Sequence, residues 1–299
     1  MSSSDSDEEA KHANSEAEDG DDKKMAKKVD GRKKRVVVGY TLASVLYLLT
    51  AVRAILTQNN QLSVGTIAYA SCGSVLASGL AFIQKGAAEN DRLRSDTYKR
   101  LNIFMAWHGF LVSIITLKAL FGPDPLALMT NVIAMVNSIK GYGYGARGWT
   151  LREGVPFVED LTQVVKNTVQ GMIGSFPQNM KSIGYFLGTA TVGTLKISKG
   201  MEVGKLLIQS GGSISFLVGT RLFRCTKLGL LAVCMYNLKD AADRDRLNGT
   251  TFIQLNFLCS LVWASMAYYI YERYPLALLG TRATLRPTIT AALAGFLAL

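Results

Sequence analysis

The feature that most constrains the fold is a succession of apolar segments close to the length of a bilayer crossing. The first runs from Val36 to Leu56, the second from about Leu62 to Ile83 and the third from about Leu101 to Phe121. About 20 apolar residues suffice for an α-helix to cross the hydrocarbon core. A shorter fourth segment, Leu126–Ile139, needs the aromatic residues after it to complete a crossing. The sequence therefore predicts an all-α polytopic membrane protein.

Two polar segments have similar sequences at an offset of 154 residues. Residues 85–102 read KGAAENDRLRSDTYKRLN and residues 239–256 read KDAADRDRLNGTTFIQLN, with nine of 18 positions identical. Chance gives roughly one match at ordinary residue frequencies. Residues 64–66 return at the same offset as residues 218–220, and residues 125–128 return four residues early as 275–278. Three matching segments that occur in the same order predict a tandem duplication.

The duplication predicts two transmembrane repeats, over residues 36–149 and 182–299, each of about four helices. Four crossings are an even number, so the two repeats are expected to share one orientation, as parallel repeats do in some transporters. The expected spans of the second repeat are residues 183–195, about 206–238, 251–270 and 276–299. The total is six to eight crossings, with eight as the estimate.

The linker between the repeats, residues 150–181, has the pattern of an amphipathic helix between Pro156 and Pro177. Its apolar residues recur at helical spacing, while charged and amide residues occupy the other positions. We expect this helix to lie in the cytoplasmic interface of the membrane. Packing against a soluble domain is the alternative, and the chain has no soluble domain of any size.

Residues 1–35 form a tail that is acidic up to Asp22 and basic from Lys23 to Arg35. With almost no apolar residues, the tail is predicted to be disordered. The basic part, and the bases between Lys85 and Arg100, predict a cytoplasmic N-terminus, because such residues stay on that side. Lys23–Arg35 is expected to contact anionic lipids. An endomembrane or the plasma membrane is favoured, without a choice between them.

Small residues recur along the second apolar segment at Ala70, Gly73, Ala77 and Ala81. Small side chains at this spacing allow two helix backbones to approach closely. We interpret these positions as a helix-packing surface.

The second repeat carries cations inside its apolar segments, at Arg221, Arg224, Lys227, Arg282 and Arg286. A cation at the bilayer centre costs roughly 3 kcal/mol on insertion scales, so such residues usually face a cavity, a partner or the interface. They are candidate contacts for an anion or for lipid phosphates. The alternatives are snorkelling to the interface and, as a weaker match, voltage sensing.

The repeated polar segments are a candidate surface, represented by Asp91 and Arg92 in the first copy and by Asp245 and Arg246 in the second. Retention of the pattern in both copies fits a cytoplasmic binding surface. It also fits a structural role, in which these charges cap helix ends and pair with each other.

The chain has four cysteines without metal-site spacing and only two histidines. No nucleophile–base pair, metal cluster or phosphate-binding loop is visible, so we expect neither an enzyme nor a bound cofactor or metal. The lipid bilayer is the expected partner, a homo-oligomer is compatible with these patterns, and nucleic acid is not expected. The first functional hypothesis is a transporter or channel for a small anionic solute. The alternative is a non-catalytic membrane-organising or scaffold protein of an endomembrane or organelle.

Overall fold

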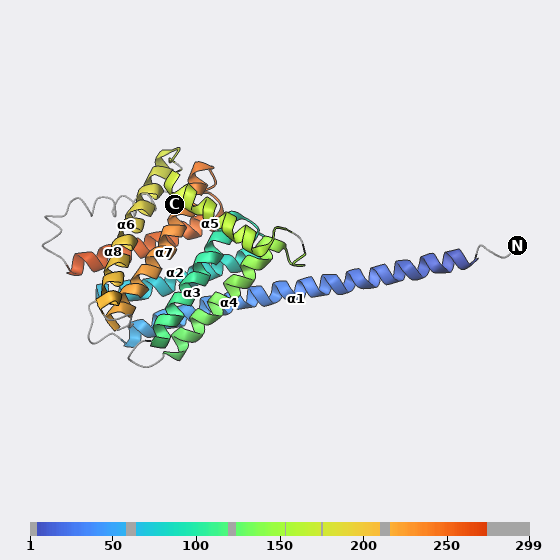
Figure 1. The fold of residues 1–299 in the computed structure, drawn as a ribbon, viewed down its shortest axis with the longest axis horizontal. Helices are drawn as coiled ribbons and strands as arrows, with labels where there is room; N and C mark the ends of the chain where they lie inside the picture. The colour runs from blue at the N-terminus through green and yellow to red at the C-terminus, as the bar shows by residue number, and fades with distance from the viewer. Residues whose placement is uncertain are drawn as a thin grey trace.

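The computed structural model describes residues 5–57, 64–118, 124–152, 154–174, 176–209 and 216–273. All regular secondary structure in these residues is α-helical (Figure 1). In chain order the helices are α1 (Asp5–Thr57), α2 (Val64–Glu89), α3 (Asp96–Lys118), α4 (Pro125–Arg147), α5 (Phe157–Gly174), α6 (Met180–Gln209), α7 (Phe216–Asp243) and α8 (Thr250–Arg273).

One end of the bundle, called the loop end below, holds the short loops 90–95 and 244–249. Helices α2, α4 and α7 end there, and α3, α6 and α8 begin there: the Asn179 side chain before α6 donates to the carbonyl of Ala242 over 2.7 Å. Helix α1 passes the same end at Lys33, which pairs with Asp91 at 2.8 Å. From this level α1 and α6 both run toward the opposite end of the bundle.

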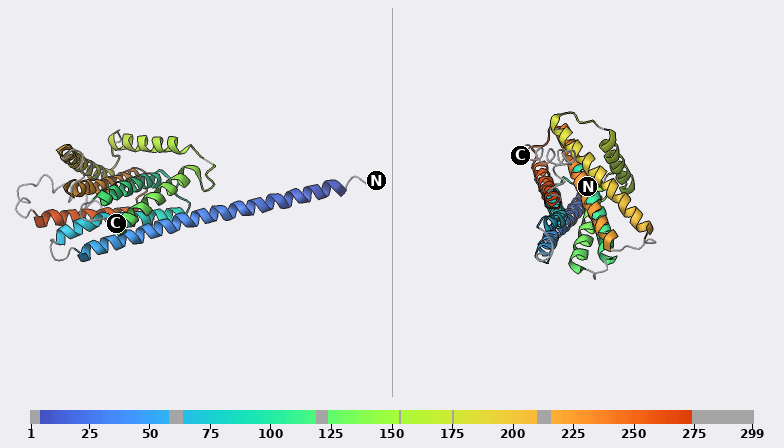
Figure 2. Two further views of the ribbon diagram at one scale, coloured as in Figure 1. Left: turned by 60° about the horizontal axis from the view of Figure 1, so that its bottom comes forward. Right: turned by 90° about the vertical axis from the view of Figure 1, so that its left-hand side faces the viewer.

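The two halves are interleaved. Helix α1 packs along α2, and α6 packs along α7 in the same manner. The next contacts cross between the halves, because α2 packs against α8 and α3 packs against α7 (Figure 2). Each half therefore completes the other, and neither forms a separate core.

The surface of the bundle is apolar. Along α1 the side chains of Val38, Leu42, Val45, Leu49 and Val52 are all exposed, and α3, α4, α6 and α8 also expose large apolar residues. Polar side chains instead lie inside and bond to one another, as Tyr47 does with Asn131 over 2.9 Å. This distribution is consistent with a lipid environment, where interhelical hydrogen bonds form inside and apolar side chains face outward.

Three helical segments in the described part of the chain are long and apolar enough to cross a membrane: Lys24–Thr57, Asp96–Leu117 and Thr250–Tyr269. They belong to α1, α3 and α8. In the described part of the chain α7 is not among these segments, and its C-terminal half is almost entirely buried. Its Lys227, Lys239 and Asp240 lower its mean hydropathy, and its neighbours in the bundle cover it.

Two boundaries in the second half differ from the sequence-based prediction. The expected short span 183–195 is part of one long helix, α6, which continues through Lys196 to Gln209. The next helix begins at Phe216, ten residues later than the expected Leu206. The predicted span ran across the serine- and glycine-rich residues 210–215, which lie outside the described residues. The expected last span, 276–299, lies outside the described residues.

In the first half, α4 extends beyond the predicted apolar stretch. It continues through the glycine- and tyrosine-rich residues to Arg147, so these residues do complete a longer helix. Asp124 caps its first turn by accepting hydrogen bonds from the backbone N–H groups of Leu126 and Ala127.

The N-terminal tail also differs from the prediction. From Asp5 onward the chain is helical and continuous with the first span, and this extension of α1 projects away from the bundle (Figure 1). The composition that argued for disorder is also rich in Ala, Glu and Lys, which have high helix propensity. A sequence rule based on missing apolar residues detects the absence of packing and does not detect this propensity.

Candidate functional site: the loop end and helix α5

The two loops at the loop end have the same backbone geometry. Asp91 and Asp245, 154 residues apart, both adopt left-handed conformations, with φ of 56° and 49°. In each copy the next residue, Arg92 or Arg246, donates its backbone N–H to a carbonyl five residues earlier over 2.8 Å. This pattern is the Schellman helix ending, which satisfies carbonyls that a helix otherwise leaves unpaired. The repeated sequence therefore encodes a helix stop.

A second pair of matched contacts joins the helices of each half. The Tyr40 hydroxyl on α1 donates to the Asn102 side chain on α3. The Tyr185 hydroxyl on α6 donates to Asn256 on α8 over 3.0 Å, and Asn256 follows Asn102 by the same 154 residues. Both bonds are buried, where an unpaired polar group costs about 1–3 kcal/mol.

The first loop carries contacts that the second does not have in the described residues. Asp91 accepts from the Lys33 ammonium and from the indole Nε1–H of Trp149, each over 2.8 Å. The hydrogen bond from Lys33 above all, helped by that from Trp149, holds the pKa of the Asp91 carboxyl below its usual value, although burial opposes this shift. Arg32 extends the contact by donating to the carbonyl of Trp149 over 2.9 Å. Arg92, Asp245 and Arg246 are exposed.

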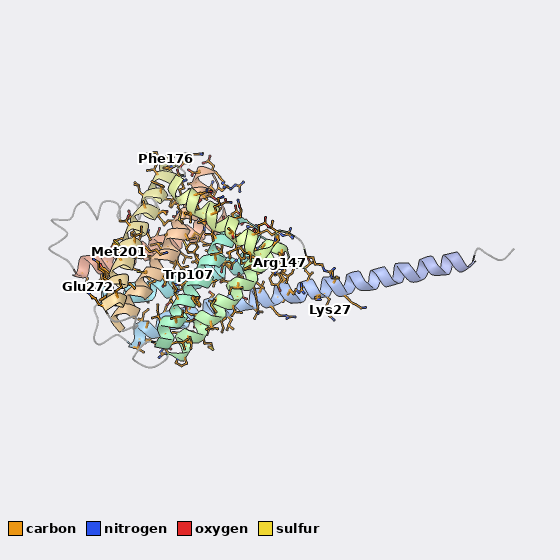
Figure 3. The ribbon with its side chains drawn as sticks, viewed as in Figure 1. Lys27, Trp107, Arg147, Phe176, Met201 and Glu272 are labelled. Atoms are coloured by element: carbon orange, nitrogen blue, oxygen red, sulfur yellow. The ribbon has the colours of Figure 1, made fainter. Side chains whose placement is uncertain are left out.

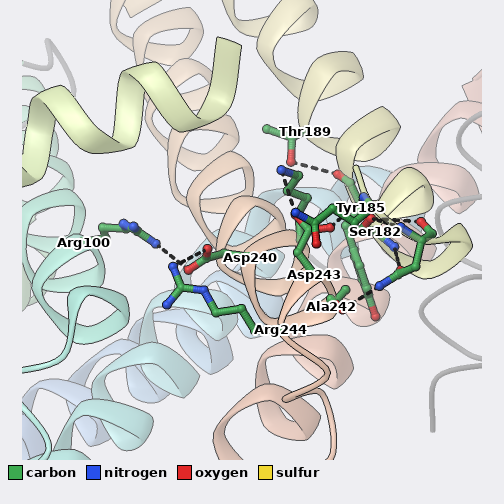
Figure 4. A network of polar contacts seen from close by, with 11 residues as sticks. Arg100, Ser182, Tyr185, Thr189, Asp240, Ala242, Asp243 and Arg244 are labelled. Carbon is green, nitrogen blue, oxygen red and sulfur yellow. Dashed lines mark hydrogen bonds and ion pairs between the residues drawn. The ribbon is translucent and has the colours of Figure 1, made fainter. Parts of the chain in front are cut away.

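Arg100 connects the two halves. Its side chain is buried and lies 3.3 Å from the Asn237 amide oxygen and 3.2 Å from the Asp240 carboxylate, both on α7. Its guanidinium carbon is 4.9 Å from the centre of the Tyr236 ring. Asp240 also pairs with the more exposed Arg244 at 3.0 Å (Figure 4). On the adjacent turn, the hydroxyls of Tyr98 and Thr251 are 2.7 Å apart, so the two loops lie side by side.

The predicted amphipathic helix is α5, and it crosses the bundle at the loop end on the side away from α1 (Figure 2). Asp160 anchors its first turn by pairing with Lys99 at 2.6 Å and accepting from the Tyr142 hydroxyl. Farther along, Gly171 faces the Tyr236 hydroxyl so closely that a Cβ there would overlap it. Helix α5 therefore spans from the first half to the second.

A cleft of about 630 Å³ lies between α5 and helices α3 and α4. Its walls are mostly apolar, with Trp107 and Phe110 from α3 and Val165 and Val169 from α5 among them. Trp107, labelled in Figure 3, is half-exposed. Deeper in the cleft lie the polar side chains of Arg100, Asn102 and Ser138.

Among the predicted cations of the second repeat, Lys227 is the one whose side chain the structure describes. It is buried and its aliphatic stem packs on Gly73, so a Cβ at position 73 would come within 2.5 Å of Lys227 Cδ. The cavity beside it has only about 10 Å³. Arg221 and Arg224 lie on α7 but their side chains are outside the described residues, and so are Arg282 and Arg286.

The predicted small-residue surface of α2 is largely internal. Ala77 and Ala81 are fully buried, while the neighbouring Ser78 donates to the carbonyl of Ser44 on α1 over 2.8 Å. Gly73 faces α7 through Lys227, and the side chain of Ala70 is not among those described.

The residues that sequence reasoning missed are Arg100, Asp160 and the two Tyr–Asn pairs. Asn102 and Asn256 were visible as identities in the repeat, yet their partners Tyr40 and Tyr185 lie 145 residues apart, outside the matched segments. Arg100 was counted only as a base that sets orientation. In the described residues, no group of three His, Cys, Asp or Glu side chains lies close enough to hold a metal ion.

Comparison of the chain with protein-family models, with curated proteins and with solved structures found no match. The functional argument therefore rests on the geometry of the molecule.

Proposed function

We propose that the chain is a membrane-organising protein, which acts on the lipid bilayer through helix α5 and the basic segment Lys23–Arg35 and performs no catalysis. The proposal is supported above all by the way α5 is presented. Its Asp160 end is fixed to the bundle by an ion pair, while Val158 and Phe176 near its two ends are 71% and 88% exposed. Val165 and Val169 are also exposed. Apolar residues on an anchored amphipathic helix are suited to insertion at the boundary of headgroups and acyl chains.

The basic segment adds an electrostatic contribution. Lys33 pairs with Asp91 of the first loop and Arg32 donates to the carbonyl of Trp149, whereas Lys27, Lys28 and Arg35 are exposed. Near anionic lipid, each exposed base contributes about 1 kcal/mol to membrane attraction. In this proposal the N-terminus and the loop end face the cytoplasm, on an endomembrane or organelle.

We also infer that the bundle consists of two parallel repeats from a duplicated unit. Support comes from the matched loops, the matched Tyr–Asn bonds and the reciprocal packing of α2 on α8 and α3 on α7. Gly73 and Lys227, which touch, are themselves 154 residues apart. Equivalent positions of two copies meet in this way only near a two-fold axis that relates them.

Transport of a small anion is the competing proposal, and it rests on the cations of α7. A water molecule needs a cavity of at least about 10–15 Å³ on the same measure. The 10 Å³ beside Lys227 therefore leaves no room for a hydrated solute at that residue. This packing favours the membrane-organising role.

The test is reconstitution of the full chain into phosphatidylserine-containing vesicles, whose shape is followed by electron microscopy. Val158→Asp, on the exposed apolar edge of α5, is expected to reduce vesicle remodelling several-fold, because a carboxylate resists burial in the interface. Gln170→Asp adds the same charge at an exposed position on the polar side of α5 and serves as the matched control. Chloride or sulfate flux that Lys227→Gln abolishes, with vesicle shape unchanged by either α5 variant, would favour transport instead.

A further inference from the structure

We propose that the hollow between the two loops of the loop end binds a phosphate group, with Arg92 and Lys85 supplying the positive charge. The inference rests on the proposed function only for the position of this hollow at the cytoplasmic surface of a membrane.

The hollow measures about 230 Å³ and has walls from both halves of the bundle. Lys85, Glu89 and Arg92 line it at the end of α2 and in the loop that follows, and Thr250 and Thr251 line it at the beginning of α8. Its volume is below the roughly 300–1,000 Å³ of sites for drug-sized ligands. The hollow therefore suits one small polar group and is too small for a whole cofactor.

A comparison of the two halves shows why protein does not fill the hollow. In the contact that joins α3 to α7, the Arg100 guanidinium pairs with Asp240. The residues 154 positions away from this pair both line the hollow, Gln254 after Arg100 and Gly86 before Asp240. A Cβ at Gly86 would meet no neighbouring atom within 4 Å. Neither member of the ion pair is thus present at the hollow, and a charged group from outside can take a place there.

The charge at the hollow is positive. Lys85 pairs with Glu89 at 2.8 Å, so this carboxylate is neutralised, and an ammonium group has further hydrogens to donate. The Arg92 side chain is exposed and forms no hydrogen bond or ion pair in the described part of the chain. A guanidinium presents its donors in a planar fork that matches two oxygens of a phosphate. A cationic ligand would instead be repelled by Arg92 and Lys85.

The first turn of α8 adds uncharged donors on the other wall. Gly249 precedes the helix, and its carbonyl accepts from the backbone N–H of Ile253 over 3.1 Å. Thr250 and Thr251 are therefore the first helical residues, whose backbone N–H groups have no acceptor within the helix. This end of a helix also attracts negative charge. A tetrahedral phosphate can accept from this wall and from Arg92 together, whereas a planar carboxylate has only two oxygens to share.

The phosphate has two sources, the headgroup of a phospholipid and a soluble phosphate. Phe82, which is 54% exposed, lines the hollow beside Lys85, whose ammonium lies 5.8 Å from the centre of its ring. An apolar side chain next to phosphate donors suits a lipid whose acyl chains lie along the bundle.

One experiment separates the two sources. The full chain is purified in a maltoside detergent, which contains no phosphate, and receives inorganic phosphate in one arm and phosphatidic acid in the other. Binding is followed by the line width of the phosphorus NMR signal. Broadening by the parent protein is expected, and the arm that shows it identifies the source.

Two pairs of variants locate the phosphate. Arg92→Gln is expected to weaken binding at least about tenfold, because a hydrogen bond to a charged group is lost. Arg246→Gln, which is also exposed but lies outside the lining of the hollow, is the matched control and should bind as the parent does. Gly86→Leu places a side chain in the hollow and is expected to abolish binding. Gly200→Leu, which meets open space on α6, should retain it.

The same measurements can overturn the inference. Equal weakening by Arg92→Gln and Arg246→Gln would show that the charge of the loop end as a whole attracts the phosphate. Absence of broadening by the parent in both arms would show that the hollow binds no phosphate. Because both arginines are exposed, these two variants are expected to fold, and they decide the question even where Gly86→Leu does not fold. The assay uses micelles, so a failure here is distinct from a failure of the membrane-organising role, which is read from vesicle shape.

Discussion

The loops at Asp91 and Asp245 have the same backbone and different surroundings. Both end a helix with the same left-handed residue and the same hydrogen bond over five residues. The first is tied to α1 and to Trp149, while Asp245 is exposed and has no side-chain hydrogen bond in the described residues. The residues that the two segments share thus include those of a common helix ending, while the contacts of their side chains differ.

Arg100 is the clearest case of divergence. The residue 154 positions after it is Gln254, which lies in the partly exposed hollow between the loops. Only the first half thus contributes a buried cation to the contact with α7, beside the cleft under α5. This difference between the halves therefore lies next to α5, the helix proposed to contact the membrane.

The largest expected effect concerns the side of the membrane on which the two loops lie. With parallel repeats, Asn248 in the second loop faces the cytoplasm beside the first loop and should carry no glycan in the secretory pathway. In the change Gln61→Thr, Asn59 becomes an acceptor in the turn on the other side, which lies outside the described residues. With both sites flanked by flexible linkers, a glycan is expected at Asn59 alone. Gel mobility before and after glycosidase treatment gives the answer.

A glycan at Asn248 would contradict the parallel arrangement, because the two loops would then lie on opposite sides of the membrane and the repeats would be inverted.

The next effect is thermodynamic. Arg100→Met removes the buried cation from Asn237 and Asp240, and we expect a loss of about 3 kcal/mol in the free energy of unfolding. The matched change Gln254→Met, at the equivalent position of the second copy, should fall within about 0.5 kcal/mol of the parent. Unfolding of the purified protein in mild detergent, followed by circular dichroism, measures both. Equal losses would mean that Arg100 adds nothing to the contact between the halves.

A smaller difference separates the two left-handed residues. Asp245→Gly is expected to stabilise the protein by up to about 1 kcal/mol, because glycine adopts positive φ without strain. Asp91→Gly gains the same relief but loses Lys33 and Trp149, so it should be about 1 kcal/mol less stable than Asp245→Gly. The same unfolding assay compares the variants. Identical stabilities would show that the contacts of the first loop are not formed in solution.

The smallest effect is one of pH. The pKa of Asp91 is lowered in the folded protein by Lys33 and Trp149, so its contribution is present above the unfolded pKa of about 3.9 and is lost as pH falls through the lower folded value. We expect α1 to loosen from the first loop in this acidic window, seen as faster hydrogen exchange around Trp149. Asp91→Asn should remove the acid dependence, and an unchanged pH profile in that variant would contradict the assignment.

Much of the fold was accessible from sequence because it depends on local patterns. Apolar runs of about 20 residues identify α1, α3 and α8, and the spacing between Pro156 and Pro177 identifies α5. The boundary between α6 and α7 was misplaced because the predicted span ran across the serine- and glycine-rich residues 210–215. Continuity of α1 through the charged tail was missed because hydropathy does not report helix propensity.

The candidate site was less accessible, because it depends on contacts between distant residues. The pairing of Arg100 with Asp240 joins positions 140 residues apart. The cleft exists only because α5 returns over α3 and α4, and no local pattern records that return. Lys227 illustrates the same limit: a cation in an apolar segment was compatible with snorkelling, lipid contact or a wet cavity, whereas the structure places its stem against Gly73.

The contact between Gly73 and Lys227 also bears on how such a bundle can evolve. In a dimer of two identical single repeats, one residue type would have to face itself across the axis. Two glycines there would leave a void, and two lysines would overlap and repel. After fusion of the copies into one chain, each position can change by itself, and a large side chain can occupy the space that its counterpart vacates. Under the proposed duplication, the Gly73–Lys227 pair records that the two halves stopped being identical after fusion. Independent substitution in each half also allows the two halves to take different roles.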